Sequence, residues 1–249
     1  IRPVWPYPRI IAHRGGGRLA PENTLAAIRT GHAHGFSGVE FDVMLTSDAV
    51  PILMHDELLE RTTSGNGPVS ALPFSTLSRL DAGSWFSPAF AGEPIAAFKA
   101  AADLCRDLGL LANIEIKPAA GHDAETGRIT AETALRSWQG VNTDRSPLLS
   151  SFSLAALIAA RAAAPELPRA LIFDAIPPDW QDQLRTLECL SLHCNAQRLD
   201  RTTIQAVRDA GYGIAVWTVN DPEVARRLFS WGVNAIFTDR LDLIRPDFR

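Results

Sequence analysis

The chain contains few cysteines and no long hydrophobic run. Its three cysteines, Cys105, Cys189 and Cys194, are odd in number, and their spacing matches neither a disulfide framework nor a zinc site. We expect them to be small buried hydrophobic residues in a protein of a reducing compartment. No apolar run reaches the roughly 18 residues that a membrane-spanning helix needs, and no secretory signal is visible. These absences predict a cytoplasmic protein without stable membrane association.

An excess of basic residues is also missing. The 24 Lys and Arg residues are outnumbered by 28 Asp and Glu residues, which gives a net charge of −4. This balance argues against general binding to nucleic acids or to anionic membranes. The chain has 249 residues, 46% of them hydrophobic, so it can bury a large core as one large α/β domain or two small ones.

Apolar runs of strand length recur along the chain, and helix-like segments lie between them. Their residues do not alternate between apolar and polar, which is typical of strands buried on both faces. The eight runs are 9–13, 38–43, 111–116, 147–151, 169–173, 189–193, 213–217 and 235–237. Eight strands alternating with helices predict a (β/α)₈ TIM barrel. A doubly wound open sheet is the alternative, but no Gly-x-Gly-x-x-Gly follows the first strand to support dinucleotide binding.

Boundary signals locate several of the helices. Asp221-Pro222 is expected to open one helix that Gly232 closes, and Asp200 and Gly211 are expected to bracket another. The Ala-rich stretches at 95–108 and 154–164 have helical composition.

Two regions interrupt the alternation of strands and helices. Residues 43–55 are expected to form a hairpin around the polar turn at 46–48. Residues 56–94 form a long Ser-, Gly- and Pro-rich insertion after the second strand, and long insertions in compact domains are usually lids or binding loops. We therefore expect residues 1–249 to form a single catalytic domain with residues 56–94 as an inserted cap.

Carboxylates stand near the ends of two predicted strands. Side chains two residues apart on a strand share a face, so Glu40 and Asp42 point the same way, as do Glu115 and Lys117. Three neighbouring unpaired carboxylates would repel one another and raise one another's pKa values. A divalent cation such as Mg²⁺ or Ca²⁺ relieves that repulsion, because these ions favour oxygen ligands.

Two histidines and two cations also lie at strand ends. His13 and His55 are the candidates for a general acid and a general base, because histidine titrates near neutral pH. Arg14 offers a planar fork that suits phosphate oxygens, and Lys117 offers a point charge. The other four histidines are expected to be structural, and Asn23 is expected first to cap a helix and only second to belong to the site.

Together these motifs resemble those of glycerophosphodiester phosphodiesterases, with the cytosolic bacterial members most similar. The resemblance covers nearly the whole chain. The matching segments are His13-Arg14-Gly15, Pro21-Glu22-Asn23-Thr24, Glu40-Phe41-Asp42, Leu53-Met54-His55-Asp56, Leu59-Glu60-Arg61-Thr62, Asp81-Ala82-Gly83-Ser84-Trp85, Asn113-Ile114-Glu115-Ile116-Lys117, Leu149-Ser150-Ser151-Phe152 and Trp217-Thr218-Val219-Asn220.

The resemblance implies hydrolysis of glycerophosphodiesters to glycerol 3-phosphate and an alcohol, in a TIM barrel with an inserted cap. It implies that Glu40, Asp42 and Glu115 bind one divalent cation, Mg²⁺ or Ca²⁺ with Mn²⁺ as a further candidate. It also implies acid–base roles for the two histidines and phosphate contacts for the two cations. The family's aromatic wall near the glycerol matches Trp217, and Phe152 is a second wall candidate.

The sequence leaves the order of chemical events open. The sequence does not assign the role of base to one of the two histidines. The attacking oxygen belongs either to water or to a glycerol hydroxyl that first forms a cyclic intermediate. Two other functions compete: a phospholipase-type barrel that docks on lipid through the insertion's aromatic residues, and a non-catalytic phosphoester sensor. The expected partner is a small glycerophosphodiester, and the protein is expected to be a monomer or a homodimer.

Overall fold

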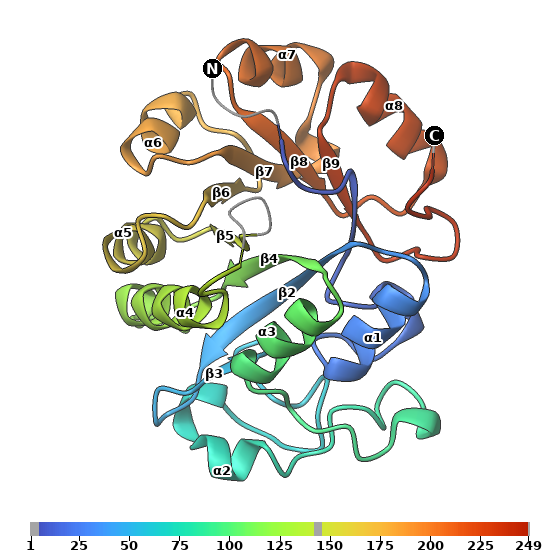
Figure 1. Cartoon of the computed structure of the whole chain (residues 1–249), viewed down its shortest axis with the longest axis vertical. Coiled ribbons are helices and arrows are strands. Elements are labelled where there is room, and N and C mark those ends of the chain that lie inside the picture. Colours follow the sequence, from blue (N-terminus) through green and yellow to red (C-terminus); the bar gives the residue numbers. More distant parts are fainter. Residues whose placement is uncertain (1–4, 142–145, 249) are drawn as a thin grey trace.

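A closed barrel of eight parallel strands forms the centre of the computed structural model, which describes residues 5–141 and 146–248. Its strands are β1 (Ile10–Ala12), β2 (Gly38–Leu45), β4 (Leu111–Ile116), β5 (Leu148–Ser151), β6 (Arg169–Phe173), β7 (Ser191–Asn195), β8 (Gly213–Trp217) and β9 (Ala235–Thr238). Strand β1 pairs with both β9 and β2, which closes the ring. The predicted TIM barrel is therefore confirmed, and the open sheet is excluded (Figure 1).

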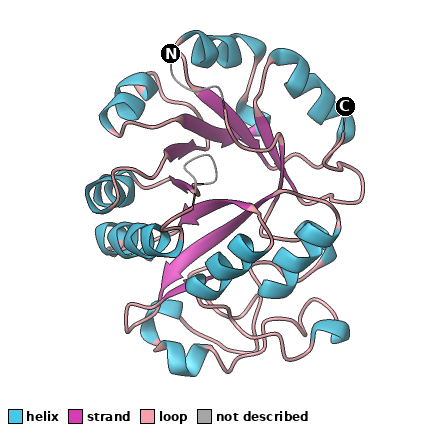
Figure 2. Ribbon diagram, in the orientation of Figure 1, coloured by secondary structure: helices cyan, strands magenta, loops and turns pink. Residues whose placement is uncertain are grey.

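Helices surround the barrel on its outer side (Figure 2). They are α1 (Leu25–Ala33), α3 (Phe98–Asp107), α4 (Asp123–Ser137), α5 (Leu154–Ala163), α6 (Trp180–Thr186), α7 (Arg201–Asp209) and α8 (Pro222–Trp231). Asp221 caps α8 by accepting hydrogen bonds from the amides of Glu223 and Val224, and Gly232 ends it in the left-handed conformation. Asp200 caps α7 in the same way, so these predicted boundaries are confirmed.

One strand lies two residues later than the sequence predicts. We expect a strand at 189–193, whereas β7 runs from Ser191 to Asn195. The apolar run starts earlier because Cys189 belongs to the turn that closes α6, where its amide donates to the carbonyl of Leu184. An apolar run indicates burial rather than a strand, and Cys189 is buried although it lies in the turn. All three cysteines are buried, as predicted.

The main core lies between the strands and the helices, and a smaller cluster of buried residues lies inside the barrel. Ala215 and Ala235 pack there beside Ile11 and Phe237. Trp5 lies against Gly213, where a Cβ atom would come within 3.1 Å of the indole ring.

The predicted hairpin is present, and a long segment with short helices follows it. Strand β3 (Pro51–Leu53) pairs antiparallel with the end of β2, with Val43 opposite Leu53. The segment that follows contains η2 (Val69–Ala71), α2 (Phe74–Leu77) and η3 (Pro88–Phe90). It packs around a small core of its own, which includes Leu59, Val69 and Leu77. In Figure 1 this segment lies beside the barrel at the β3 end.

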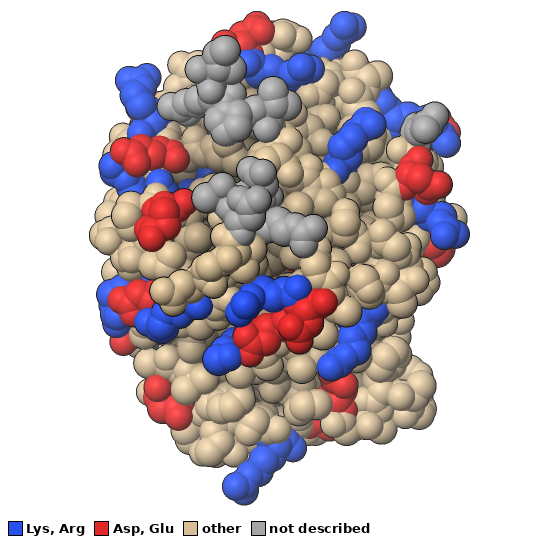
Figure 3. All heavy atoms as spheres, viewed as in Figure 1, with Lys and Arg blue, Asp and Glu red and all other residues tan. Residues whose placement is uncertain are grey.

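The surface carries charges of both signs. On the face seen in Figure 3, Lys and Arg side chains lie interspersed with Asp and Glu side chains. Among the described residues, no helix combines the length and the apolar composition that crossing a bilayer requires. The remaining short helices are η1 (Gly17–Leu19) and η5 (Ala196–Arg198).

Candidate active site

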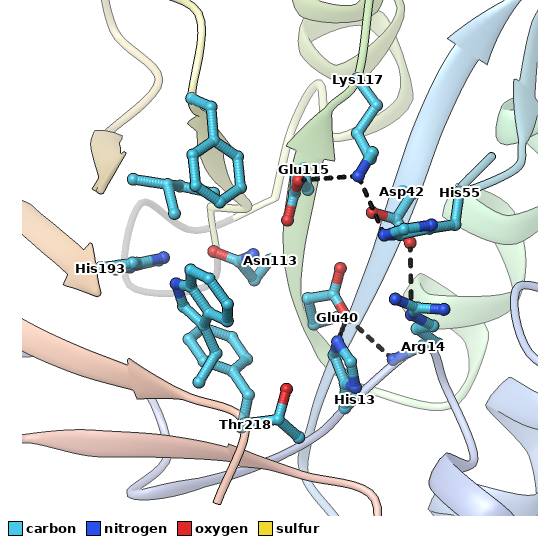
Figure 4. Close-up of a pocket in the computed structure, with 14 residues that line it drawn as sticks. His13, Arg14, Glu40, Asp42, His55, Asn113, Glu115, Lys117, His193 and Thr218 are labelled. Carbon is cyan, nitrogen blue, oxygen red and sulfur yellow. Dashed lines mark hydrogen bonds and ion pairs between the residues drawn. The ribbon is translucent and has the colours of Figure 1, made fainter. Parts of the chain in front are cut away.

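A cavity of about 280 Å³ opens at the carboxyl ends of the barrel strands. All nine residues that the sequence predicts for the site line this cavity: His13, Arg14, Glu40, Asp42, His55, Glu115, Lys117, Phe152 and Trp217. They come from β2, β4 and β8 and from the loops after β1, β3, β4 and β5, so the barrel brings together residues far apart in the sequence (Figure 4). The ionisable groups gather on the β1–β2–β4 side, and the aromatic side chains lie on the other side.

Three carboxylates form the centre of the charged side. Glu40, Asp42 and Glu115 each offer an oxygen, and these oxygens all lie within 4.8 Å of one another. Burial, together with repulsion from Asp42 and Glu115, raises the pKa of Glu40 well above its usual range. Burial and Asp42 raise the pKa of Glu115 to about 8. Within the described residues, Glu40 Oε1 is buried without a hydrogen-bond partner. Hard divalent cations prefer such oxygen ligands, so the donor set fits one.

His13 is held at the end of β1 by a carboxylate that the sequence analysis does not identify. Its Nδ1 lies 2.6 Å from Asp239 Oδ1, and its Nε2 lies 3.8 Å from Glu40 Oε2. Burial alone would raise the pKa of Asp239, but the hydrogen bond and the charge of His13 bring it down to about 2. Asn220 donates a second hydrogen bond to Asp239. Asp239 directly follows β9, so it carries the strand-end signal of the other site residues.

His55 has a similar arrangement on the opposite side of the cluster. Its Nδ1 lies 2.6 Å from Asp56 Oδ1, and its Nε2 lies 2.9 Å from Lys117 Nζ. Hydrogen bonding from Arg61 holds the pKa of Asp56 well below its usual range, so Asp56 stays ionised beside His55. Burial lowers the pKa of His55, despite the opposing charge of Asp42. Each histidine therefore has its Nδ1 tied to a carboxylate.

Arg14 and Lys117 place two positive charges beside the carboxylates. The guanidinium of Arg14 donates to Glu22 Oε1 at 2.6 Å, and its Nε is buried without a partner among the described residues. Lys117 Nζ lies 3.7 Å from Glu115 Oε1. Glu22 also accepts two hydrogen bonds of 2.8 Å from Arg61, which belongs to the insertion. The insertion is thus connected to the site through Arg61.

The first interpretation of Asn23 is wrong. Thr24, not Asn23, caps α1, because the Thr24 side chain accepts the hydrogen bond from the amide of Ala27. Asn23 has a positive φ of 58°, and its side chain turns towards β2 instead. Its amide nitrogen donates to Asp42 Oδ2 at 2.8 Å, and its oxygen accepts from the Asp42 amide. Asn23 therefore orients a carboxylate of the cluster.

The other side of the cavity is aromatic and neutral. Phe152 and Trp217 meet edge to face, with ring centroids 5.6 Å apart. His193 lines the cavity too, although the sequence favours a structural role for it. The remaining histidines, His32, His34 and His122, do not line it. Asn113, which the sequence analysis does not single out, also lines the cavity.

Comparison with known proteins identifies the family of the chain. The model of the glycerophosphoryl diester phosphodiesterase family matches residues 13–243. A glycerophosphodiester phosphodiesterase of Caldanaerobacter subterraneus subsp. tengcongensis is 33% identical over 92% of this chain and 93% of its own length. The human glycerophosphodiester phosphodiesterase 1 is 52% identical over 71 residues, 28% of this chain and 22% of its own.

Solved structures show the same fold. A phosphodiesterase of Oleispira antarctica, in complex with the product sn-glycerol-3-phosphate, is 37% identical with a TM-score of 0.89, over 94% of this chain and 93% of that one. A glycerophosphodiester phosphodiesterase of Agrobacterium tumefaciens is 30% identical with a TM-score of 0.78, over 95% and 98% of the two chains.

Proposed function

Because the chain belongs to the glycerophosphoryl diester phosphodiesterase family, an enzyme family of hydrolases, we propose that it hydrolyses glycerophosphodiesters to sn-glycerol 3-phosphate and an alcohol. One observation carries the proposal. Two carboxylate-held histidines and two cations surround a cluster of three carboxylates, two of them buried and one half-buried, in one cavity. The product bound to the Oleispira antarctica relative supports the choice of sn-glycerol 3-phosphate.

Glu40, Asp42 and Glu115 would hold one divalent cation, Mg²⁺ or Ca²⁺. The fit rests on their chemistry, since three carboxylates with oxygens close together form an oxygen-rich donor set, and Glu40 Oε1 has no hydrogen-bond partner among the described residues. When bound, the cation would offset the charge that develops on the phosphate oxygens in the transition state. Asn23 would keep Asp42 turned towards the cluster through its two hydrogen bonds.

Arg14 and Lys117 would bind the phosphate. Both cations line the cavity beside the carboxylates, and a phosphodiester between them would satisfy their charge. Arg14 still has a buried Nε–H available for a phosphate oxygen. Trp217 and Phe152 would form the wall that faces the organic part of the substrate.

His13 and His55 would share the proton transfers. One removes the proton from the attacking oxygen, and the other protonates the departing alkoxide. Asp239 and Asp56 hold the Nδ1 atoms, so proton transfer would use the Nε2 atoms, of which that of His55 lies 2.9 Å from Lys117 Nζ. Residues 1–249 would form a single catalytic domain, and residues 56–94 would cap its mouth, with Arg61 connecting the cap to Glu22.

Alanine variants of the histidines test this proposal. With glycerophosphocholine and Mg²⁺, we expect His13→Ala and His55→Ala each to lower kcat about 10²–10⁴-fold, since each loses a general acid or base. A coupled assay of sn-glycerol 3-phosphate measures the rate. His32→Ala, which changes an exposed histidine of α1 outside the cavity, is the matched control. Near-normal turnover in either cavity variant would contradict the assignment.

A further inference from the structure

A second hollow, of about 430 Å³, adjoins the cavity of the active site. The two spaces share four lining residues, His55, Glu115, Lys117 and Phe152. Lys117 Nζ lies 2.9 Å from His55 Nε2 and 3.7 Å from Glu115 Oε1, so the shared border is where the proposed function places the phosphate (Figure 4). A phosphodiester carries two organic arms. One arm faces the aromatic wall of the cavity, and the hollow offers a place for the other.

Most of the lining that belongs to the hollow alone carries no charge. It is formed by Met44, Glu57, Ile116, Pro118, Ser151 and Ser153. Both serine hydroxyls already donate hydrogen bonds of 2.7 Å, Ser151 to the carbonyl of Ile116 and Ser153 to Asp123 Oδ1. The hollow therefore offers an alcohol mainly apolar surface, with few hydrogen-bonding groups that are still available.

Glu57 is the exception in this lining. It is the second residue of the insertion, and its backbone is held in place because its carbonyl accepts a hydrogen bond of 2.9 Å from the amide of Val69. Its side chain is exposed, and among the described residues its carboxylate has no ion-pair or hydrogen-bond partner. In the same part of the chain, Lys117 is the only Lys or Arg that lines the hollow, and the phosphate would balance its charge. Glu57 therefore leaves an unbalanced negative charge in the hollow.

A ligand that complements this hollow carries a positive charge on a small apolar group. The carboxylate of Glu57 attracts the charge, and Phe152, which is 48% exposed, offers an aromatic ring that also favours cations. We propose that the hollow binds the alcohol part of the substrate and that Glu57 selects alcohols that carry an ammonium group. This inference rests on the proposed function, which places the phosphate beside Lys117, and it assigns the class of alcohol that the enzyme releases.

Two glycerophosphodiesters that differ in the charge of the alcohol test the role of Glu57. Glycerophosphocholine carries a cation there and glycerophosphoglycerol carries none, and the same coupled assay with Mg²⁺ measures sn-glycerol 3-phosphate from both. We expect Glu57→Gln to lower kcat/KM for glycerophosphocholine about three- to fivefold, the effect of one exposed ion pair. The value for glycerophosphoglycerol should stay within about 1.5-fold.

Reversal of the charge and a change of salt concentration sharpen this test. Glu57→Lys should lower kcat/KM for glycerophosphocholine further than Glu57→Gln does, because the alcohol then meets a like charge. High salt should reduce the difference between the wild type and both variants, since an exposed charge pair is screened. Glu60→Gln is the matched control, because Glu60 is an exposed glutamate of the same insertion that does not line the hollow. It should keep the wild-type ratio of the two kcat/KM values.

Two results would overturn the inference in an active enzyme. The first is a ratio of the two kcat/KM values that stays unchanged in both Glu57 variants. The second is an equal loss on both substrates, since Glu57 would then act on the fold or on the phosphate end. If the wild type hydrolyses neither ester, the proposed function itself is rejected, and this inference is rejected with it.

Discussion

In each candidate catalytic histidine, the Nδ1 atom is hydrogen-bonded to a carboxylate. Nδ1 of His13 is bound to Asp239, and Nδ1 of His55 is bound to Asp56. A hydrogen bond at one ring nitrogen selects the tautomer and the orientation of the other. The two carboxylates are themselves fixed, by Asn220 and by Arg61 respectively. Proton transfer at Nε2 therefore depends on residues that need not touch the substrate.

We expect Asp239→Asn to lower kcat about 10²–10⁴-fold with little change in KM, because His13 would lose the acceptor that orients it. Steady-state kinetics with glycerophosphocholine measures both constants. Glu132→Gln, which changes a carboxylate on the outer helix α4, should behave like the wild type. A change confined to KM would show that Asp239 acts on substrate binding rather than on His13.

His193 predicts a specific acid sensitivity. Burial lowers its pKa in the folded protein from 6.5 to about 3. Below pH 6.5 the unfolded chain binds a proton at this residue and the folded protein does not, so stability falls as the pH drops towards 3. Between pH 7 and pH 5 the loss amounts to about 2 kcal/mol of unfolding free energy.

Urea unfolding at the two pH values measures this contribution. The wild type should lose about 2 kcal/mol more than His193→Phe between pH 7 and pH 5, since the other titrating groups are common to both proteins. Equal losses in the two proteins would mean that His193 becomes protonated in the folded state.

At the scale of single residues, the sequence identifies the candidate site residues but not the side chains with which they form hydrogen bonds. The strand-end rule identifies His13, Glu40, Asp42, His55 and Glu115, because the barrel sends all strand ends to one face. The helix-cap prediction for Asn23 is wrong, because whether Asn23 or Thr24 caps the helix depends on backbone dihedral angles that the sequence does not show. Asn113 was overlooked because an asparagine within a strand carries no charge signal.

Two helices make close backbone contacts at glycines, where the absence of a side chain leaves room for a neighbouring carbonyl group. A Cβ atom at Gly31 of α1 would overlap the backbone carbonyl of Gly15, in the loop that carries His13 and Arg14. A Cβ atom at Gly127 of α4 would overlap the backbone carbonyl of Ala156 in α5. Backbone atoms cannot move aside as a flexible side chain can, so both contacts require glycine.

Helix propensity alone predicts that Gly31→Ala and Gly127→Ala stabilise the protein. The overlaps turn this stabilisation into a destabilisation, and we expect each variant to lose about 1–3 kcal/mol of unfolding free energy. Denaturant titration measures this cost. Kinetics then separates the two positions, since only Gly31→Ala displaces the loop of His13 and should lower kcat/KM. Equal kinetics in both variants would show that the overlap at Gly31 is relieved away from the active site.

Elements are predictable from the sequence where local signals agree. Asp221-Pro222 and Gly232 mark both ends of α8, because capping chemistry is local. The start of β7 is not marked, since Cys189 and Leu190 in the turn before it are apolar like the strand that follows. The short helices of the insertion follow no apolar period that the sequence reveals, because their packing depends on the separate small core.

Closure of the barrel brings the segments after the first and the last strand together at the active site. His13 follows the first strand and contacts Asp239, which follows the last strand, and β1 pairs with both β9 and β2. The buried carboxylates concentrate negative charge in a cavity within a protein of net charge −4. Repulsion among these carboxylates contributes to the raised pKa values of Glu40 and Glu115. In the proposed function, a divalent cation held by the carboxylates would offset their negative charge.

Metal dependence tests this account most directly. Protein stripped with EDTA is incubated with glycerophosphocholine, and sn-glycerol 3-phosphate is measured before and after addition of Mg²⁺, Mn²⁺ or Ca²⁺. The account predicts no product from the stripped wild type, recovery with at least one of these ions, and no recovery in the Glu40→Gln, Asp42→Asn double variant. Full activity of the stripped wild type, or recovery of the double variant to the wild-type rate, would contradict it.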